Sequence, residues 1–305
     1  MRVSNVGWAG ADNRRILMGL FALFLSGFFA LVYELCWIRM ASLVFGSTVA
    51  AVSTVLASFF GGLAIGSFAF GRLAQSTQRP LRWYCGLEIG LCGLALISPL
   101  MFDVAEQVYV YVSAGDQSVG AMTQLLIFAL VGAVLLPPTI LMGGTLPLFC
   151  RAIAIDQVRV TRITGILYGV NTLGAATGCW VAGMVLIPKL GVDASIHAAA
   201  VITCLAAVLV AWIAWQDRAE PTSFAKDKTT EPTMRAGRIG LLFFGVGFVA
   251  LGSEVFWVRF LKLLIRNSVH TYTITLTFTL LGIVLGSLQV ARMAEHRVRP
   301  AALFA

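Results

Sequence analysis

Eight apolar stretches, each long enough to cross a lipid bilayer, constrain this chain more than any other feature of its sequence. A membrane-spanning helix needs about 20 apolar residues. The stretches occupy residues 16–38, 48–71, 83–102, 122–150, 163–188, 194–215, 239–261 and 269–291. Backbone polar groups find no water partner in lipid, so each stretch is predicted to be a helix rather than a lone strand. The sequence therefore predicts an all-α polytopic protein of a lipid bilayer.

Composition agrees with this class. Apolar residues make up 59% of the chain and charged residues only 12%, whereas soluble domains are about one quarter charged. An ordinary soluble enzyme and a globular domain with one anchor are both excluded, because the apolar surplus extends along the whole length.

The basic residues indicate an orientation. Seventeen of the 22 Lys and Arg residues fall in the termini and every second connection, which predicts that both termini are cytoplasmic. The net charge of +8 is then a topology signal, and no nucleic acid partner is expected. The hydrophilic segment 216–238 is predicted to be a cytoplasmic linker between a six-helix bundle in residues 1–215 and two helices in residues 239–305.

An internal repeat relates these two parts at an offset of 220 residues. The segment GFFALVYELCWIRM (27–40) aligns without gaps with GFVALGSEVFWVRF (247–260), and the match continues into the following helix. It pairs Glu34 with Glu254, Trp37 with Trp257, Arg39 with Arg259, Gly62 with Gly282 and Gly66 with Gly286. Both copies are predicted to start at the cytoplasmic side. They are thus parallel repeats, arranged six plus two, like the two halves of major-facilitator (MFS) transporters.

Three segments resemble one family. The run from Ser26 to Ala74, PPTILMGGTLPLFCRA (137–152) and GILYGVNTLGAATGCWVAGMVLIPKLG (165–191) are similar to the membrane part of bacterial fused MFS-like/spermidine synthase proteins. The resemblance implies a multi-pass protein of the bacterial inner membrane that is associated with polyamine chemistry. Relatives of this kind commonly carry a cytoplasmic aminopropyltransferase domain. No Gly-rich loop after a strand is recognisable here, so no catalytic residue, no cofactor and no enzymatic activity is expected in these residues.

The strongest candidate site residues are the paired motifs. Ionisable side chains inside a span normally face the bundle interior or a partner. Glu34 and Arg39 are about 140° apart on a helix, so the pseudo-twofold axis is predicted to place Glu34 beside Arg259 and Glu254 beside Arg39. Such pairs serve either structural anchoring or the handling of a solute or proton. The competing interpretation places both motifs at helix ends, with Trp37 and Trp257 in an interfacial belt.

Two further polar side chains lie within spans. Glu88 stands between Gly86 and Gly90; it either binds a cation or accepts a hydrogen bond from Arg72 or Arg82, and the second is favoured. Asn171 is expected either to bridge two helices or to face a wet cavity.

The remaining patterns concern packing. Pro137, Pro138 and Pro147, with Gly143 and Gly144, are expected to interrupt the fourth span and leave carbonyl groups to be satisfied; such a break either lines a binding path or is a kink without function. Glycines four residues apart indicate close helix contacts. The six cysteines lack ligand spacing, so neither a disulfide nor a metal site is expected.

Three functions are compatible with these features. The leading hypothesis is an MFS-like module that binds or transports a small cationic, polyamine-like solute between its repeats. Alternatively, the chain is an assembly subunit whose seventh and eighth spans pack against other membrane proteins. The third possibility is the membrane part of an aminopropyltransferase whose enzymatic domain lies elsewhere.

Overall fold

The computed structural model describes residues 13–46, 49–113, 121–153, 160–216, 234–264 and 268–295. Both termini and most of the predicted linker lie outside these ranges. Helices account for all the regular structure in them: α1 Asn13–Val44, α2 Val49–Ser76, α3 Pro80–Ser113, α4 Ala121–Ile153, α5 Val160–Val181, η3 Ala182–Leu186, α6 Ile187–Leu190, α7 Val192–Gln216, α8 Met234–Leu264 and α9 Ser268–Glu295.

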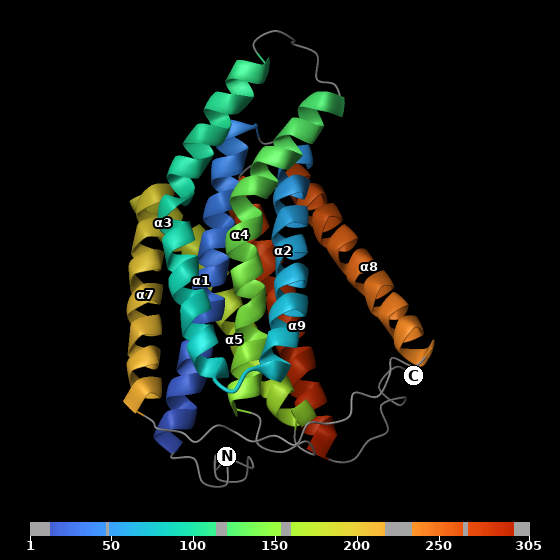
Figure 1. The fold of residues 1–305 in the computed structure, drawn as a ribbon. Helices are drawn as coiled ribbons and strands as arrows, with labels where there is room; N and C mark the ends of the chain where they lie inside the picture. The colour runs from blue at the N-terminus through green and yellow to red at the C-terminus, as the bar shows by residue number, and fades with distance from the viewer. Residues whose placement is uncertain are drawn as a thin grey trace.

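The predicted fold class is confirmed. Eight helical segments in the described part of the chain are long and apolar enough to span a membrane, and they correspond one to one to the eight apolar stretches. Figure 1 shows α1 to α7 and α9 as one bundle. The C-terminal end of α3 and the N-terminal end of α4 extend beyond the other helices.

Helix α8 is packed differently from the rest. Its main neighbour is α9, and Figure 1 shows it inclined away from the bundle over most of its length. Most of its large apolar side chains are exposed, whereas those of α1, its repeat partner, are mostly buried. The two copies of the repeat therefore have similar sequences and dissimilar surroundings.

Helix α4 is not interrupted, contrary to the sequence-based expectation. It runs continuously from Ala121 to Ile153 through all three prolines. Pro147 cannot donate a hydrogen bond to the carbonyl group of Gly143, but Ser67 Oγ of α2 donates to that oxygen over 2.9 Å. A side chain of α2 thus provides a hydrogen bond to the carbonyl oxygen that Pro147 leaves free, and α4 remains helical.

The irregular span is the fifth one. After α5, the chain makes the π-helical turn η3, in which the N–H group of Ile187 donates to the carbonyl oxygen of Ala182. Gly183 in this turn is in tight contact with Thr273 of α9, so that a Cβ atom would overlap the threonine hydroxyl.

The glycine pairs of the first copy pack as predicted. Gly62 and Gly66 of α2 lie directly on Thr139 and Ile140 of α4, and Gly174 and Gly178 of α5 lie on backbone carbonyl groups of α1. In the second copy, by contrast, nothing lies within 4 Å of the Cβ positions at Gly282 and Gly286.

Candidate functional site

The carboxyl group of Glu34 in α1 lies in the interior of the bundle and is only 2% exposed. Its Oε1 atom accepts a hydrogen bond from Tyr272 Oη of α9, over 3.2 Å. Tyr272 belongs to the second repeat and is itself buried. The hydrogen bond therefore joins the two repeats in the interior of the protein.

Glu254 of α8, the repeat partner of Glu34, lies in the same region. It is 8% exposed, and its Oε1 atom has no hydrogen-bond partner. The two carboxyl groups are close enough to interact electrostatically, and both also act on Tyr272 and on Cys179 of α5. The site is thus a buried pair of acids from equivalent positions, with a tyrosine hydroxyl between the repeats.

The predicted crossed acid–base pairs are not formed between the described side chains. Glu34 is bound to Tyr272 instead of Arg259, which is exposed, and Arg39 is half-buried without a bond to Glu254. The physical reason is the helical angle. Because α8 turns its Glu254 face inward, Arg259, about 140° away, is turned outward.

The two tryptophans of the motif have opposite environments. Trp37 is completely buried, and its Nε1–H donates to Ser98 Oγ of α3 over 2.9 Å. Ser98 in turn donates to the carbonyl oxygen of Ala95, over 2.8 Å, which is the acceptor that Pro99 leaves free. Trp257 is 51% exposed. The interpretation that both tryptophans lie in an interfacial belt is therefore wrong for Trp37.

Glu88 forms a separate site in the first six helices. It is buried, and its Oε1 atom accepts a hydrogen bond from Ser26 Oγ of α1 over 2.5 Å. The favoured partner, Arg72 or Arg82, is wrong, because Glu88 is buried while Arg82 is exposed. The guanidinium group of Arg72 lies 4.0 Å from the ring centre of Phe68, on its own helix. The possibility of a cation at Glu88 stays open.

Asn171 of α5 lies at the contact with α1. Its backbone oxygen and its side-chain Oδ1 atom both lie against Gly27. Asn171 therefore lies between two helices, which is the first of its two expected roles.

Sequence reasoning missed Tyr272, the residue that connects Glu34 to the second repeat. It lies in a stretch with threonine at every second position, where Thr275 and Thr279 donate back to carbonyl groups one turn earlier. Tyr272 has no polar counterpart in the first repeat, since Val52 stands there. A search restricted to repeated residues could therefore not find it.

The six cysteines lie in five of the helices. All six are free thiols, and four of them are buried. Within the ranges that the structure describes, no three His, Cys, Asp or Glu side chains are grouped so that they could hold a metal ion.

The fold defines the class: the chain is a polytopic all-α integral membrane protein. Comparison with known family models, with curated proteins and with solved structures gives no match for this chain.

Proposed function

We propose that this protein is an MFS-like membrane module that binds a small organic cation, polyamine-like in chemistry, at the Glu34–Glu254 pair, and that it transports this solute. The observation that supports the proposal is the buried pair itself. Two carboxyl groups placed together in a membrane interior need a cation or a proton. The resemblance to MFS-like/spermidine synthase proteins favours an ammonium-bearing solute.

The chemical groups of the pair suit such a ligand. A linear polyamine presents ammonium groups separated by methylene carbons, which match two carboxyl groups flanked by apolar side chains. Glu254 contributes an oxygen atom with no protein partner, and Tyr272 contributes a hydroxyl group that already contacts Glu34. Since the acids come from the two repeats, movement of α8 relative to α1 would change their separation and hence the affinity for the solute.

The test is binding of radiolabelled spermidine to the purified chain in lipid nanodiscs. Glu34→Gln and Glu254→Gln should each weaken binding about 10- to 100-fold, because each removes one charge-assisted contact of about 1.5–3 kcal/mol. Glu106→Gln, which removes an exposed acid of α3, should bind as the natural sequence does. Unchanged binding in both site variants, or absence of spermidine binding by the natural sequence, would refute the proposal.

A second candidate function is assembly with another membrane polypeptide. It is favoured by the contrast between equivalent glycines. Gly27, Gly62 and Gly66 are in direct contact with α5 or α4, whereas nothing lies within 4 Å of the Cβ positions at their counterparts Gly247, Gly282 and Gly286. Gly286 also borders an open groove of about 610 Å³ between α5 and α9. Small-residue faces of this kind accept a closely packed helix.

Assembly predicts a stable complex. Extracted from its own membranes in a mild detergent, the 32.7 kDa chain should be found by native mass spectrometry bound to a further helical polypeptide, and Gly286→Leu should release it. Gly61→Leu, at a glycine whose Cβ position is also open but which aligns with Leu281 in the second copy, should leave the complex intact. A bare monomer under these conditions, or equal behaviour of the two variants, would argue against this role.

A further inference from the structure

The surroundings of the Glu34–Glu254 pair contain acids and neutral groups only. The titratable groups that act on Glu34 from the helices packed against it are Glu254 of α8, Tyr272 of α9 and Cys179 of α5. None of these groups carries a positive charge, and the arginines of the repeated motif do not act on either carboxyl group. The pair therefore has no basic partner among the described side chains.

Two ionised carboxylates would be costly at this place. Glu34 is 2% exposed and Glu254 is 8% exposed. A carboxylate that leaves water without a counter-ion loses more free energy of hydration than a single hydrogen bond returns, and a second negative charge in the same region adds repulsion. Tyr272 Oη donates to Glu34, but Oε1 of Glu254 has no hydrogen-bond partner. Without a solute, each carboxyl group is therefore expected to hold a proton and to be neutral.

A cationic solute and these protons compete for the same oxygen atoms. When two ammonium groups bind two neutral carboxyl groups, both O–H bonds break, two N–H···O contacts form, and two protons pass to the water on the side from which the solute came. The charge gained from the two ammonium groups equals the charge lost with the two protons. We propose that the Glu34–Glu254 pair exchanges protons for the solute, so that solute and protons move in opposite directions. This inference rests on the proposed function.

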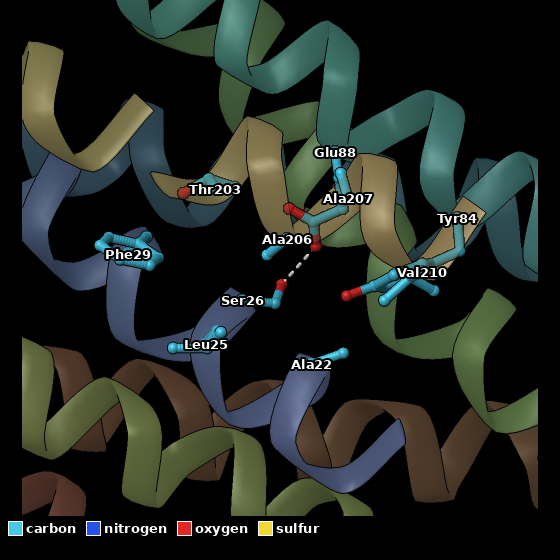
Figure 2. Close-up of a pocket in the computed structure, with 10 residues that line it drawn as sticks. All are labelled: Ala22, Leu25, Ser26, Phe29, Tyr84, Glu88, Thr203, Ala206, Ala207 and Val210. Atoms are coloured by element: carbon cyan, nitrogen blue, oxygen red, sulfur yellow. Dashed lines mark hydrogen bonds between the residues drawn. The ribbon is translucent and has the colours of Figure 1, made fainter. Parts of the chain in front are cut away.

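Glu88 of α3 provides an internal comparison. It is buried, and it borders a cavity of about 10 Å³ between α1, α3 and α7. Figure 2 shows that Ser26 donates a hydrogen bond to its carboxyl group and that the hydroxyl group of Tyr84 lies nearby. The cavity is close to the space that one water molecule requires, which is too small for an ammonium-bearing solute. Ser26 and Glu34 are also about 12 Å apart along α1. A proton on Glu88 should thus stay in place when the solute binds.

Proton release on binding is the direct test. Spermidine is added at saturation to the purified chain in lipid nanodiscs, in a weakly buffered solution with a pH-indicator dye, and bound radiolabel is counted in the same sample. The natural sequence should release about two protons per spermidine bound. Glu34→Gln and Glu254→Gln should each release about one, because one titrating carboxyl group is removed. Glu88→Gln and the exposed Glu106→Gln should release as many protons as the natural sequence.

The affinity should also depend on pH. Between about pH 6 and pH 7, where the ammonium groups of the solute stay charged, a higher pH removes the competing protons and strengthens binding. Exchange of two protons lowers the Kd about 100-fold per pH unit, and exchange of one lowers it about tenfold. The natural sequence and Glu88→Gln should show the steeper dependence, whereas Glu34→Gln and Glu254→Gln should show the shallower one.

The outcomes separate this inference from the proposed function. Spermidine binding with no proton release and with a Kd independent of pH would overturn the exchange and leave the proposed function standing. Absence of spermidine binding would refute both. Proton release that is undiminished in both variants of the pair, or that is halved in Glu88→Gln, would overturn the assignment to Glu34 and Glu254. The proton count and the pH dependence of the natural sequence need no variant, so they decide the question even if a substitution prevents folding.

Discussion

Gly27→Leu is expected to abolish the folded state of this protein, whereas Gly247→Leu, at the same position of the second repeat, should be tolerated. At Gly27 even a Cβ atom would overlap the backbone oxygen of Asn171 in α5. Neither backbone can yield without separating α1 from α5, one of the most extensive helix contacts in the bundle. Overpacking typically costs about 1–3 kcal/mol and more where the backbone cannot shift, and leucine adds four carbon atoms at this contact.

Gly247 provides the matched control. It is exposed on α8, and nothing lies within 4 Å of its Cβ position, so leucine there should change stability by less than about 1 kcal/mol. The measurement is the midpoint of thermal unfolding in detergent, followed by dye labelling of the buried thiols of Cys36 and Cys179. Equal effects of the two substitutions would show that α1 and α8 have equivalent environments, contrary to the structure.

Trp37→Ala is expected to be the second severe change. Trp37 is completely buried, stacks on Tyr33 with ring centroids 5.7 Å apart and donates a hydrogen bond to Ser98. Removing the indole leaves a large void and breaks the chain of hydrogen bonds that ends at the carbonyl oxygen freed by Pro99. Large-to-small changes at buried aromatic residues lower the free energy of unfolding by about 3–5 kcal/mol. Lipid does not reach the buried site, so it cannot replace the lost packing contacts.

Trp257→Ala tests the same residue in the other copy. Half of the Trp257 side chain is exposed, and its ring contacts are with Phe256 and Phe260 of its own helix. A loss of less than about 1 kcal/mol is expected. The same thiol-labelling assay ranks the two variants, and a Trp257 variant as unstable as the Trp37 variant would mean that α8 is packed as tightly as α1.

These pairs show how far the sequence could be interpreted without coordinates. The repeat was recognisable in the amino-acid sequence, and the spacing of the glycines predicted that residues four apart make close contacts. Which copy makes those contacts was not visible, because Gly62 and Gly282 have the same local pattern and differ only in the helix opposite them. Glu34 and Glu254 were recognised because they occupy equivalent positions of the repeat. Tyr272, the hydrogen-bond partner of Glu34, lies outside the repeated pattern.

Two local predictions failed because a distant residue changed the outcome. Prolines in α4 were expected to interrupt the helix, yet Ser67 of α2 satisfies the oxygen that Pro147 leaves free, and the helix continues. Likewise, Glu88 was expected to bind an arginine from a nearby connection, but Ser26 of α1, 62 residues away in sequence, provides its hydrogen bond.

The sequence by itself determined that this protein spans a membrane with eight helices, since an apolar segment in lipid must satisfy every backbone polar group within itself. Only the tertiary structure decided that Glu34 binds Tyr272 rather than an arginine, that Trp37 is buried and Trp257 is not, and that Glu88 borders a cavity. Burial and pairing depend on which helices are neighbours, and that depends on contacts between residues far apart in the chain.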